Sequence, residues 1–245
     1  MAGVVGLMKS VVARLTDVLT VEGFVVSEPL DGLGSAGPSG QKNPSWVRVW
    51  FVAPDSGVPG MIKAVQATVQ RDGHGGVVIS AHATIVSSVL EGVLEGMSAD
   101  VLAKGGRDRN DLASVNFGYF ERPLDPREIP VGGEGGIDYA MGKFVKILRG
   151  PVADWFVGFD SPAGLLAAAR VSATMADWDR VNPDPVVLRA AVVLSVVNGA
   201  VRDAADLMGW YLDRGGFHKW DSFDRVSGFD AAMAARFPEY ARLRG

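Results

Sequence analysis

Alternation between apolar and polar residues is clearest from Ser45 to Ala53, and this stretch organises the prediction for the first half of the chain. It reads SWVRVWFVA, and a proline on each side marks its ends. Val, Trp and Phe fit the pleated surface of a sheet, where successive side chains point to opposite faces. One face would carry Val47, Val49 and Phe51, and the other Trp46, Arg48 and Trp50. The pattern predicts a central strand of an antiparallel sheet.

Two further alternating stretches, Ile62–Gln70 and Val77–Val86, indicate that this sheet is an antiparallel meander. The turn between them, Arg71–Gly76, contains Asp-Gly, a dipeptide typical of hairpins. His82 falls on the polar face of the second stretch, where we predict a structural role for it. Val115–Glu121 is rich in aromatic residues and predicts one more strand.

The predicted strands have one apolar face, which another element has to cover. Val4–Gly23 keeps its apolar residues at helical spacing, so it predicts an amphipathic helix that provides this cover. A short strand at Phe24–Val26 and a helix at Ser87–Lys104 complete this half. Asp31–Asn43 is rich in Gly, Ser and Pro, which predicts a mobile surface loop that trypsin would cut early at Lys42.

After Pro123–Gly136, the period of the apolar residues changes from two to that of a helix. That segment holds three Pro and four Gly and predicts a boundary between domains. Caps, prolines and glycines mark the ends of five predicted helices. These are Ile137–Leu148, stopped by Gly150-Pro151, then Ser161–Ala176, Pro185–Asn198, Val201–Arg214 and Ser222–Tyr240. The predicted fold is α+β, with a helix-backed antiparallel sheet domain over residues 1–130 and a helical domain over residues 131–245.

The amino-acid composition limits the classes of protein to which this chain could belong. The chain has 245 residues, 48% apolar and 21% charged, which is typical of a globular protein with a sizeable core. The absence of cysteine excludes disulfides and thiolate metal sites. A net charge of −4 argues against a nucleic-acid-binding protein, and no apolar run reaches the roughly 18 residues of a membrane span. We predict a cytoplasmic protein, and the high content of Ala, Val, Gly, Arg and Asp with few Lys favours a bacterial source.

Motifs for cofactors and metals are missing from the sequence. There is no phosphate-binding loop, and GGEGG at Gly132–Gly136 lacks the spacing of a dinucleotide-binding turn, so it is interpreted as a linker. The three histidines, His74, His82 and His218, have no second ligand at metal-binding spacing. We therefore expect no cofactor and no metal.

One segment, GGFHKWDSFD before the last predicted helix, brings together a base, an aromatic ring and carboxylates. These are His218, Trp220, Asp221 and Asp224. One interpretation is a connector in which Asp221 or Ser222 caps the next helix. The alternative is a hydrolase-like site that uses the histidine and the two carboxylates.

Two pairs of carboxylates, Asp203/Asp206 and Asp221/Asp224, are spaced so that each pair would share one face of a helix. A solvated face explains both pairs without catalysis. Catalytic pairs are buried so that their pKa values move apart, and the sequence shows no sign of such burial.

Trp210 is a large aromatic residue on what is otherwise the polar face of a predicted helix. It falls on the same helix face as Asp203, Asp206 and Asp213, at offsets of seven, four and three residues. A large aromatic residue is usually well buried, which favours cover by the Phe217–Trp220 segment. The alternative is that Trp210 is exposed as an anchor for a partner.

Three segments give the chain a layout that resembles a group of uncharacterised bacterial proteins: FGYFERPL from Phe117, WFVGFDSPAGLLAAA from Trp155 and RFPEYARLR from Arg236. In that group a leading helix ends in Gly-Phe, antiparallel strands follow, and later helices carry a Trp-Phe pair. Gly23-Phe24 and Trp155-Phe156 match these features, whereas the Gly-rich loop before the first long strand and the longer helical tail depart from them. Some members are suspected immunity or toxin-neighbourhood proteins, so the resemblance implies an immunity-like role and no catalytic residues.

These observations favour a non-catalytic protein-binding or regulatory protein, immunity-like, whose partner is another protein. The rival expectations are a hydrolase-like enzyme with a site at the junction of the halves near His218, and a structural or phage-type assembly component. The expected interface residues are Trp210, His218, Trp220, Asp221 and Asp224. No catalytic residue and no metal ligand is assigned.

Overall fold

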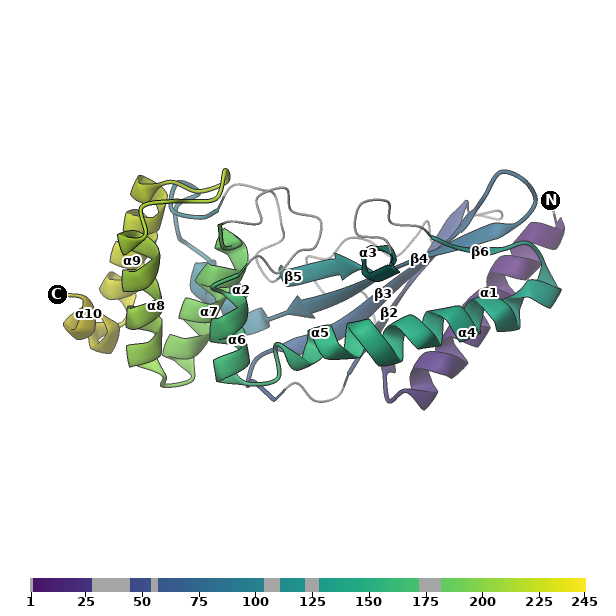
Figure 1. The fold of residues 1–245 in the computed structure, drawn as a ribbon, viewed down its shortest axis with the longest axis horizontal. Helices are drawn as coiled ribbons and strands as arrows, with labels where there is room; N and C mark the ends of the chain where they lie inside the picture. The colour runs from purple at the N-terminus through teal and green to yellow at the C-terminus, as the bar shows by residue number, and fades with distance from the viewer. Residues whose placement is uncertain (1, 28–44, 54–56, 104–110, 122–127, 172–181) are drawn as a thin grey trace. The chain divides into compact units, whose positions relative to one another are not determined.

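The computed structural model describes residues 2–27, 45–53, 57–103, 111–121, 128–171 and 182–245 (Figure 1). The predicted loop at Asp31–Asn43, with Lys42, lies outside these residues. Helices and strands follow in the order α1 (Ala2–Val21), β1 (Val25–Ser27), β2 (Trp46–Val52), β3 (Ile62–Arg71), β4 (Val77–Val86), α2 (Ser88–Leu94), β5 (Asp111–Asn116), α3 (Phe117–Glu121), β6 (Ile129–Val131), η1 (Glu134–Gly136), α4 (Ile137–Ile147), η2 (Leu148–Val152), α5 (Ala153–Val157), α6 (Pro162–Ala168), α7 (Pro185–Val197), α8 (Val201–Asp213), α9 (Phe223–Arg236) and α10 (Pro238–Arg244).

Contacts between Cα atoms divide the chain into two compact units. The sheet unit comprises Met1–Ser56, Ile62–Ile85 and Ser114–Phe156, and the helical unit comprises Gly57–Met61, Val86–Ala113 and Val157–Gly245. The chain therefore passes between the units several times, and α4 belongs to the sheet unit. The domain boundary expected at residue 130 stays a prediction. The division into compact units does not test whether residues 1–130 or residues 131–245 fold alone.

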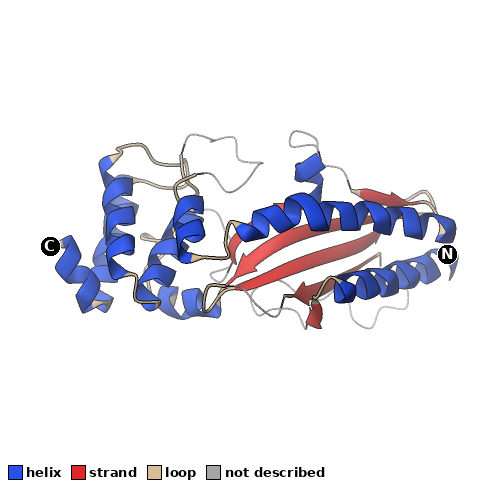
Figure 2. Ribbon diagram, turned by 60° about the horizontal axis from the view of Figure 1, so that its bottom comes forward, coloured by secondary structure: helices blue, strands red, loops and turns tan. Residues whose placement is uncertain are grey.

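The sheet unit contains the predicted antiparallel sheet, and the α+β fold class is confirmed. The strand order is β1-β2-β3-β4-β5, with β6 paired to β4. Figure 2 shows α1 and α4 lying across one face of this sheet, and α1 contacts both β2 and β3. Opposite Phe51 in the register lies Val65, and both side chains are fully buried. Phe51 therefore points to the covered face, as the alternation predicts.

Helix α1 forms because its apolar positions recur on one stripe. That stripe is buried and consists of Leu7, Met8, Val11, Leu15 and Leu19. The helix ends at Gly23, whose φ of 87° is the left-handed conformation that glycine adopts without steric cost. The cover predicted for the sheet is thus present.

One prediction about the sheet's later strands needs correction. The strand predicted at Val115–Glu121 is wrong beyond Asn116, because Phe117–Glu121 forms α3. Asn116 turns the chain here, since its side-chain oxygen accepts a hydrogen bond from the Gly118 backbone N–H at 2.7 Å. The segment predicted as a domain boundary carries β6, which pairs with Val77–Ile79 of β4.

The helical stop predicted at Gly150-Pro151 is confirmed as a break, because α4 ends at Ile147 and Gly150 has non-helical backbone angles. The chain continues through the π-type turn η2 into α5, and Gly150 absorbs the irregular backbone with φ −98° and ψ −107°. Val152 and Phe156 beyond the turn are buried, and the Phe156 ring lies 6.4 Å from that of Phe24. A separate helix therefore follows the break, and burial of these side chains stabilises it.

The helical unit is built around α7, whose residues are buried nearly all round as predicted. The carboxylate of Asp184 caps α7 by accepting from the Val186 N–H at 2.8 Å. Gly199, with φ 83°, separates α7 from α8. The last predicted helix is divided at Phe237, which is extended before Pro238 because a residue preceding proline avoids the helical region.

Two predicted helices are shorter in the structure. Helix α2 ends at Leu94, close to Gly96, whose φ of 82° lies outside the helical region. Helix α6 starts at the predicted Ser161 cap, which accepts from the Gly164 N–H at 3.0 Å, and it ends at Ala168. No helix in the described ranges combines the length and the apolar character that crossing a bilayer would require.

Candidate functional site

Arg189 is the one charged residue in the apolar sequence of α7, and it is buried. Its Nη1 and Nη2 atoms donate to the two carboxylate oxygens of Asp221 at 2.8 Å each. Nη1 also donates to the Pro185 carbonyl and Nε to the Val101 carbonyl, both at 3.1 Å. A fork of two parallel hydrogen bonds is the strong geometry for a guanidinium and a carboxylate.

The carboxylate of Asp221 accepts hydrogen bonds from two further donors. Its Oδ2 atom accepts from the Tyr211 hydroxyl at 3.1 Å, and Oδ1 accepts from the Ser222 N–H at 3.1 Å. Burial, together with the Asp221 charge, raises the pKa of Tyr211 well above its usual value, so this phenol stays protonated and donates. The network joins α7, α8 and the segment before α9, which identifies it as structural.

These contacts correct the prediction of a solvated Asp221/Asp224 pair. The side chain of Asp221 is 0% exposed and precedes the helix, whereas Asp224 is exposed in the first turn of α9. Ser222 caps α9 by accepting from the Arg225 N–H at 3.3 Å, so the predicted connector with a Ser222 cap is confirmed.

His218 is also turned into the protein, with 1% of its surface exposed. Its Nδ1 atom accepts from the Trp220 backbone N–H at 3.2 Å, and its carbonyl accepts from the Asp221 N–H at 2.8 Å. The rings of His218 and Trp220 are 4.7 Å apart, and the Lys219 ammonium lies 5.2 Å from the centre of the Trp220 ring. Among the predicted interface residues, His218, Trp220 and Asp221 therefore hold one another in a folded turn.

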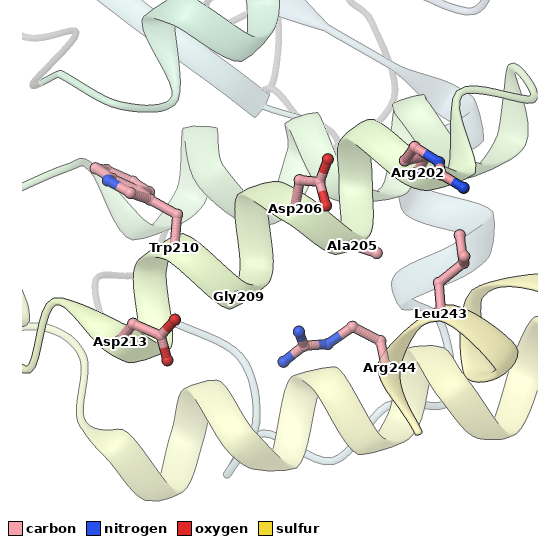
Figure 3. A pocket seen from close by; sticks show the side chains of 8 residues that line it. All are labelled: Arg202, Ala205, Asp206, Gly209, Trp210, Asp213, Leu243 and Arg244. Carbon is pink, nitrogen blue, oxygen red and sulfur yellow. The ribbon is translucent and has the colours of Figure 1, made fainter.

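Trp210 lies in a different environment, at a groove beside α8. The groove has a volume of about 410 Å³ and is lined by Arg202, Ala205, Asp206, Gly209, Trp210, Asp213, Leu243 and Arg244. Figure 3 shows the first six of these along α8 and the last two on α10. The structure thus separates Trp210 from the other four predicted interface residues.

Trp210 is half-buried, and arginines flank it. The guanidinium carbons of Arg170 and Arg214 lie over its ring, 5.5 and 5.3 Å from the centre. Such cation–π contacts hold an indole in place without removing it from the surface. Phe217, which we expected to help cover Trp210, instead packs edge-on against Tyr211 with ring centres 5.2 Å apart.

The α10 side of the groove is positioned by Asp230 of α9. Its carboxylate accepts from Nε and Nη2 of Arg244, the shorter contact being 2.7 Å, and from the Tyr240 hydroxyl. A Cβ atom on Gly209 would lie 3.1 Å from Nη1 of Arg244, so glycine allows this close approach. Asp230 raises the pKa of Arg244 above its usual value and keeps its charge.

The lining of the groove combines apolar and charged side chains. It presents an indole, the half-exposed Leu243 and charges of both signs, which is the composition of an interface with a polar rim. Within the residues that the structure describes, no three His, Asp or Glu side chains are grouped so that they could hold a metal ion.

Sequence reasoning missed Arg189, although the signal was present. A single arginine in an otherwise apolar helix has to find an acceptor, because burying an unpaired charge is costly. The sequence did not reveal which carboxylate would approach it. Comparison of the chain with protein-family models, with curated proteins and with solved structures finds no match.

Proposed function

We propose that this chain is a non-catalytic protein-binding or regulatory protein, and that the groove beside α8 is its contact surface. The immunity-like role that the resemblance implies is one form of this proposal. Its setting is the bacterial cytoplasm, as the composition favours.

The observation that carries the proposal is the placement of Trp210. A tryptophan that is half-buried, held by two arginines and next to an open groove has the properties of an interface anchor. Aromatic and arginine side chains dominate the binding energy of protein interfaces, and a polar rim excludes water around them. Asp206, Asp213 and Arg202 would supply that rim.

The hydrolase-like alternative is less well supported by the same contacts. A general base and its carboxylate partner need free atoms that face a substrate. The oxygens of Asp221 are occupied by Arg189, Tyr211 and Ser222, and Asp224 lies exposed on α9. A structural or phage-type assembly role would use the same anchor, with a copy of an assembly subunit as the partner.

Replacing Trp210 with alanine is expected to abolish partner capture while leaving folding nearly intact. The ring is half-buried and held mainly by arginines, so its removal leaves no large cavity. Immobilised full-length protein would be exposed to lysate of the source cells, and captured proteins would be identified by mass spectrometry. Affinity of the purified partner should fall by about thirtyfold or more, the range of interface hot spots.

Phe223→Ala provides a matched control, because Phe223 is an aromatic residue of the same unit, 58% exposed and absent from the groove lining. It should retain capture of the partner. Equal capture by wild type and Trp210→Ala would contradict the proposal. So would a large drop in the urea midpoint of Trp210→Ala, since this would identify the ring as a core residue.

A further inference from the structure

The sheet unit has a second face, opposite the face that α1 and α4 cover, and this face is polar. The register of β2 and β3 places Arg48 opposite Thr68, and Trp50 opposite Gln66. On β4 and β5 the same face continues through His82 and through the side chains that hydrogen-bond beside it, Ser80, Thr84, Ser114 and Asn116. Four neighbouring strands therefore contribute polar side chains to this face.

Arg48 is the cationic group of this polar sheet face. It is half-buried and donates from Nε to the Thr68 hydroxyl at 3.4 Å. With the Gln66 amide turned so that its oxygen faces the guanidinium, that oxygen accepts from Nε at 2.9 Å. The guanidinium carbon lies 5.3 Å from the centre of the Trp46 ring. All these partners are neutral, and none of the ion pairs formed between described residues includes Arg48.

Asn116 orients His82 on the same face. The Gly118 N–H donates to the side-chain oxygen of Asn116, so the Asn116 amide nitrogen points to the Ser80 hydroxyl at 3.3 Å and to His82 Nε2 at 3.4 Å. An amide nitrogen can only donate, so Nε2 accepts and the proton of the neutral ring is on Nδ1. The ring therefore has one N–H left to donate.

Trp50 adds an aromatic wall that retains an unused donor. Its side chain is 3% exposed, and its Nε1 atom is buried without a hydrogen-bond partner within the described ranges. Because the Nε1 atom is not exposed, Trp50 contributes its ring to this face as an apolar wall.

We propose that the polar sheet face is a binding site for the oxyanion group of a small molecule, a carboxylate or a phosphate, with Arg48 as its principal ligand. A half-buried guanidinium without a carboxylate partner is costly unless an anion approaches it. Its planar fork fits carboxylate and phosphate oxygens. The Nδ1–H of His82 supplies a further donor, and the indole rings of Trp46 and Trp50 supply apolar walls, which is the usual mixture in small-molecule sites.

Arg48→Gln in the full chain is the direct test, read by NMR of ¹⁵N-labelled protein. Inorganic phosphate and acetate are titrated separately at constant ionic strength. Wild type should show saturable shifts confined to β2, β3, β4 and β5, and Arg48→Gln should weaken the binding by at least about tenfold, as loss of a charged hydrogen bond does. Arg48→Lys, which keeps the charge and loses the fork, should be intermediate. The anion with the lower Kd identifies the preferred group.

Arg14→Gln is the matched control. It removes the same charge from the same unit, at an exposed α1 residue that pairs with Asp138 at 3.4 Å. It should bind both anions as wild type does. Shifts spread over the whole surface, or equal affinities in wild type and Arg48→Gln, would overturn the proposal, as would no saturation by either anion.

The titration of His82 gives an independent readout. Burial, with a contribution from the Arg48 charge, lowers the pKa of His82 below its usual 6.5. The charged groups of described residues that approach this face are Arg48 and Glu128, and Glu128 accepts a hydrogen bond from Gln70, the register partner of Trp46. A bound anion offsets the field of Arg48, so it should raise the pKa of His82.

By linkage, the anion should bind more tightly as the pH falls through the pKa of His82. Sulfate is the probe for this measurement, because its own charge does not change in that range. His82→Gln should remove the pH dependence and keep binding. An unchanged His82 pKa in saturating sulfate would place the anion elsewhere and overturn the site.

Discussion

Asp221→Ala is expected to destabilise the helical unit by about 3–5 kcal/mol, the usual cost of removing one partner from a buried ion pair. Without its carboxylate, the Arg189 guanidinium would stay buried in α7 with only the Pro185 and Val101 carbonyls as acceptors. The Tyr211 hydroxyl would lose its acceptor as well. Urea denaturation followed by circular dichroism measures the change.

Asp224→Ala is the control, because it removes the same charge three residues later from an exposed position. Its effect should be within about half a kcal/mol, as for surface substitutions. The double replacement Arg189→Met with Asp221→Leu should recover most of the loss, since an apolar pair of similar volume often matches a buried ion pair. Equal effects of Asp221→Ala and Asp224→Ala would contradict the structural role of the bridge.

Phe51→Ala is expected to cost the sheet unit about 3–5 kcal/mol, as truncation of a buried aromatic residue does. The Phe51 side chain is fully buried on the covered face of β2, opposite the equally buried Val65. The same urea experiment measures the loss. A value below about half a kcal/mol would remove Phe51 from the core.

Val26→Ala is the matched control for the register. Val26 is the register partner of Phe51 in the neighbouring edge strand β1, and it is 49% exposed. Its truncation should change the stability by no more than about half a kcal/mol, because little apolar surface returns to water. A comparable loss from both variants would show that the edge strand contributes as much to the core as β2 does.

Local sequence determined most of the individual elements. Strand alternation assigned Phe51 to the covered face, and Asp184 and Ser222 marked helix starts that their side chains do cap. These signals depend on neighbours within a few residues, so they can be interpreted without a tertiary structure. They failed beyond Asn116, where Phe117–Glu121 was predicted as strand and forms α3 instead.

Tertiary structure alone decided the chemistry of the candidate residues. Asp221 was expected to be solvated, and it is instead buried in an ion pair with Arg189, which lies 32 residues earlier in the chain, on α7. No local pattern specifies such a partner, because a lone buried arginine requires an acceptor and does not say which one. Likewise, α10 lies across the groove from Trp210, and strands β3 and β4 surround Arg48; only the folded chain brings these elements together.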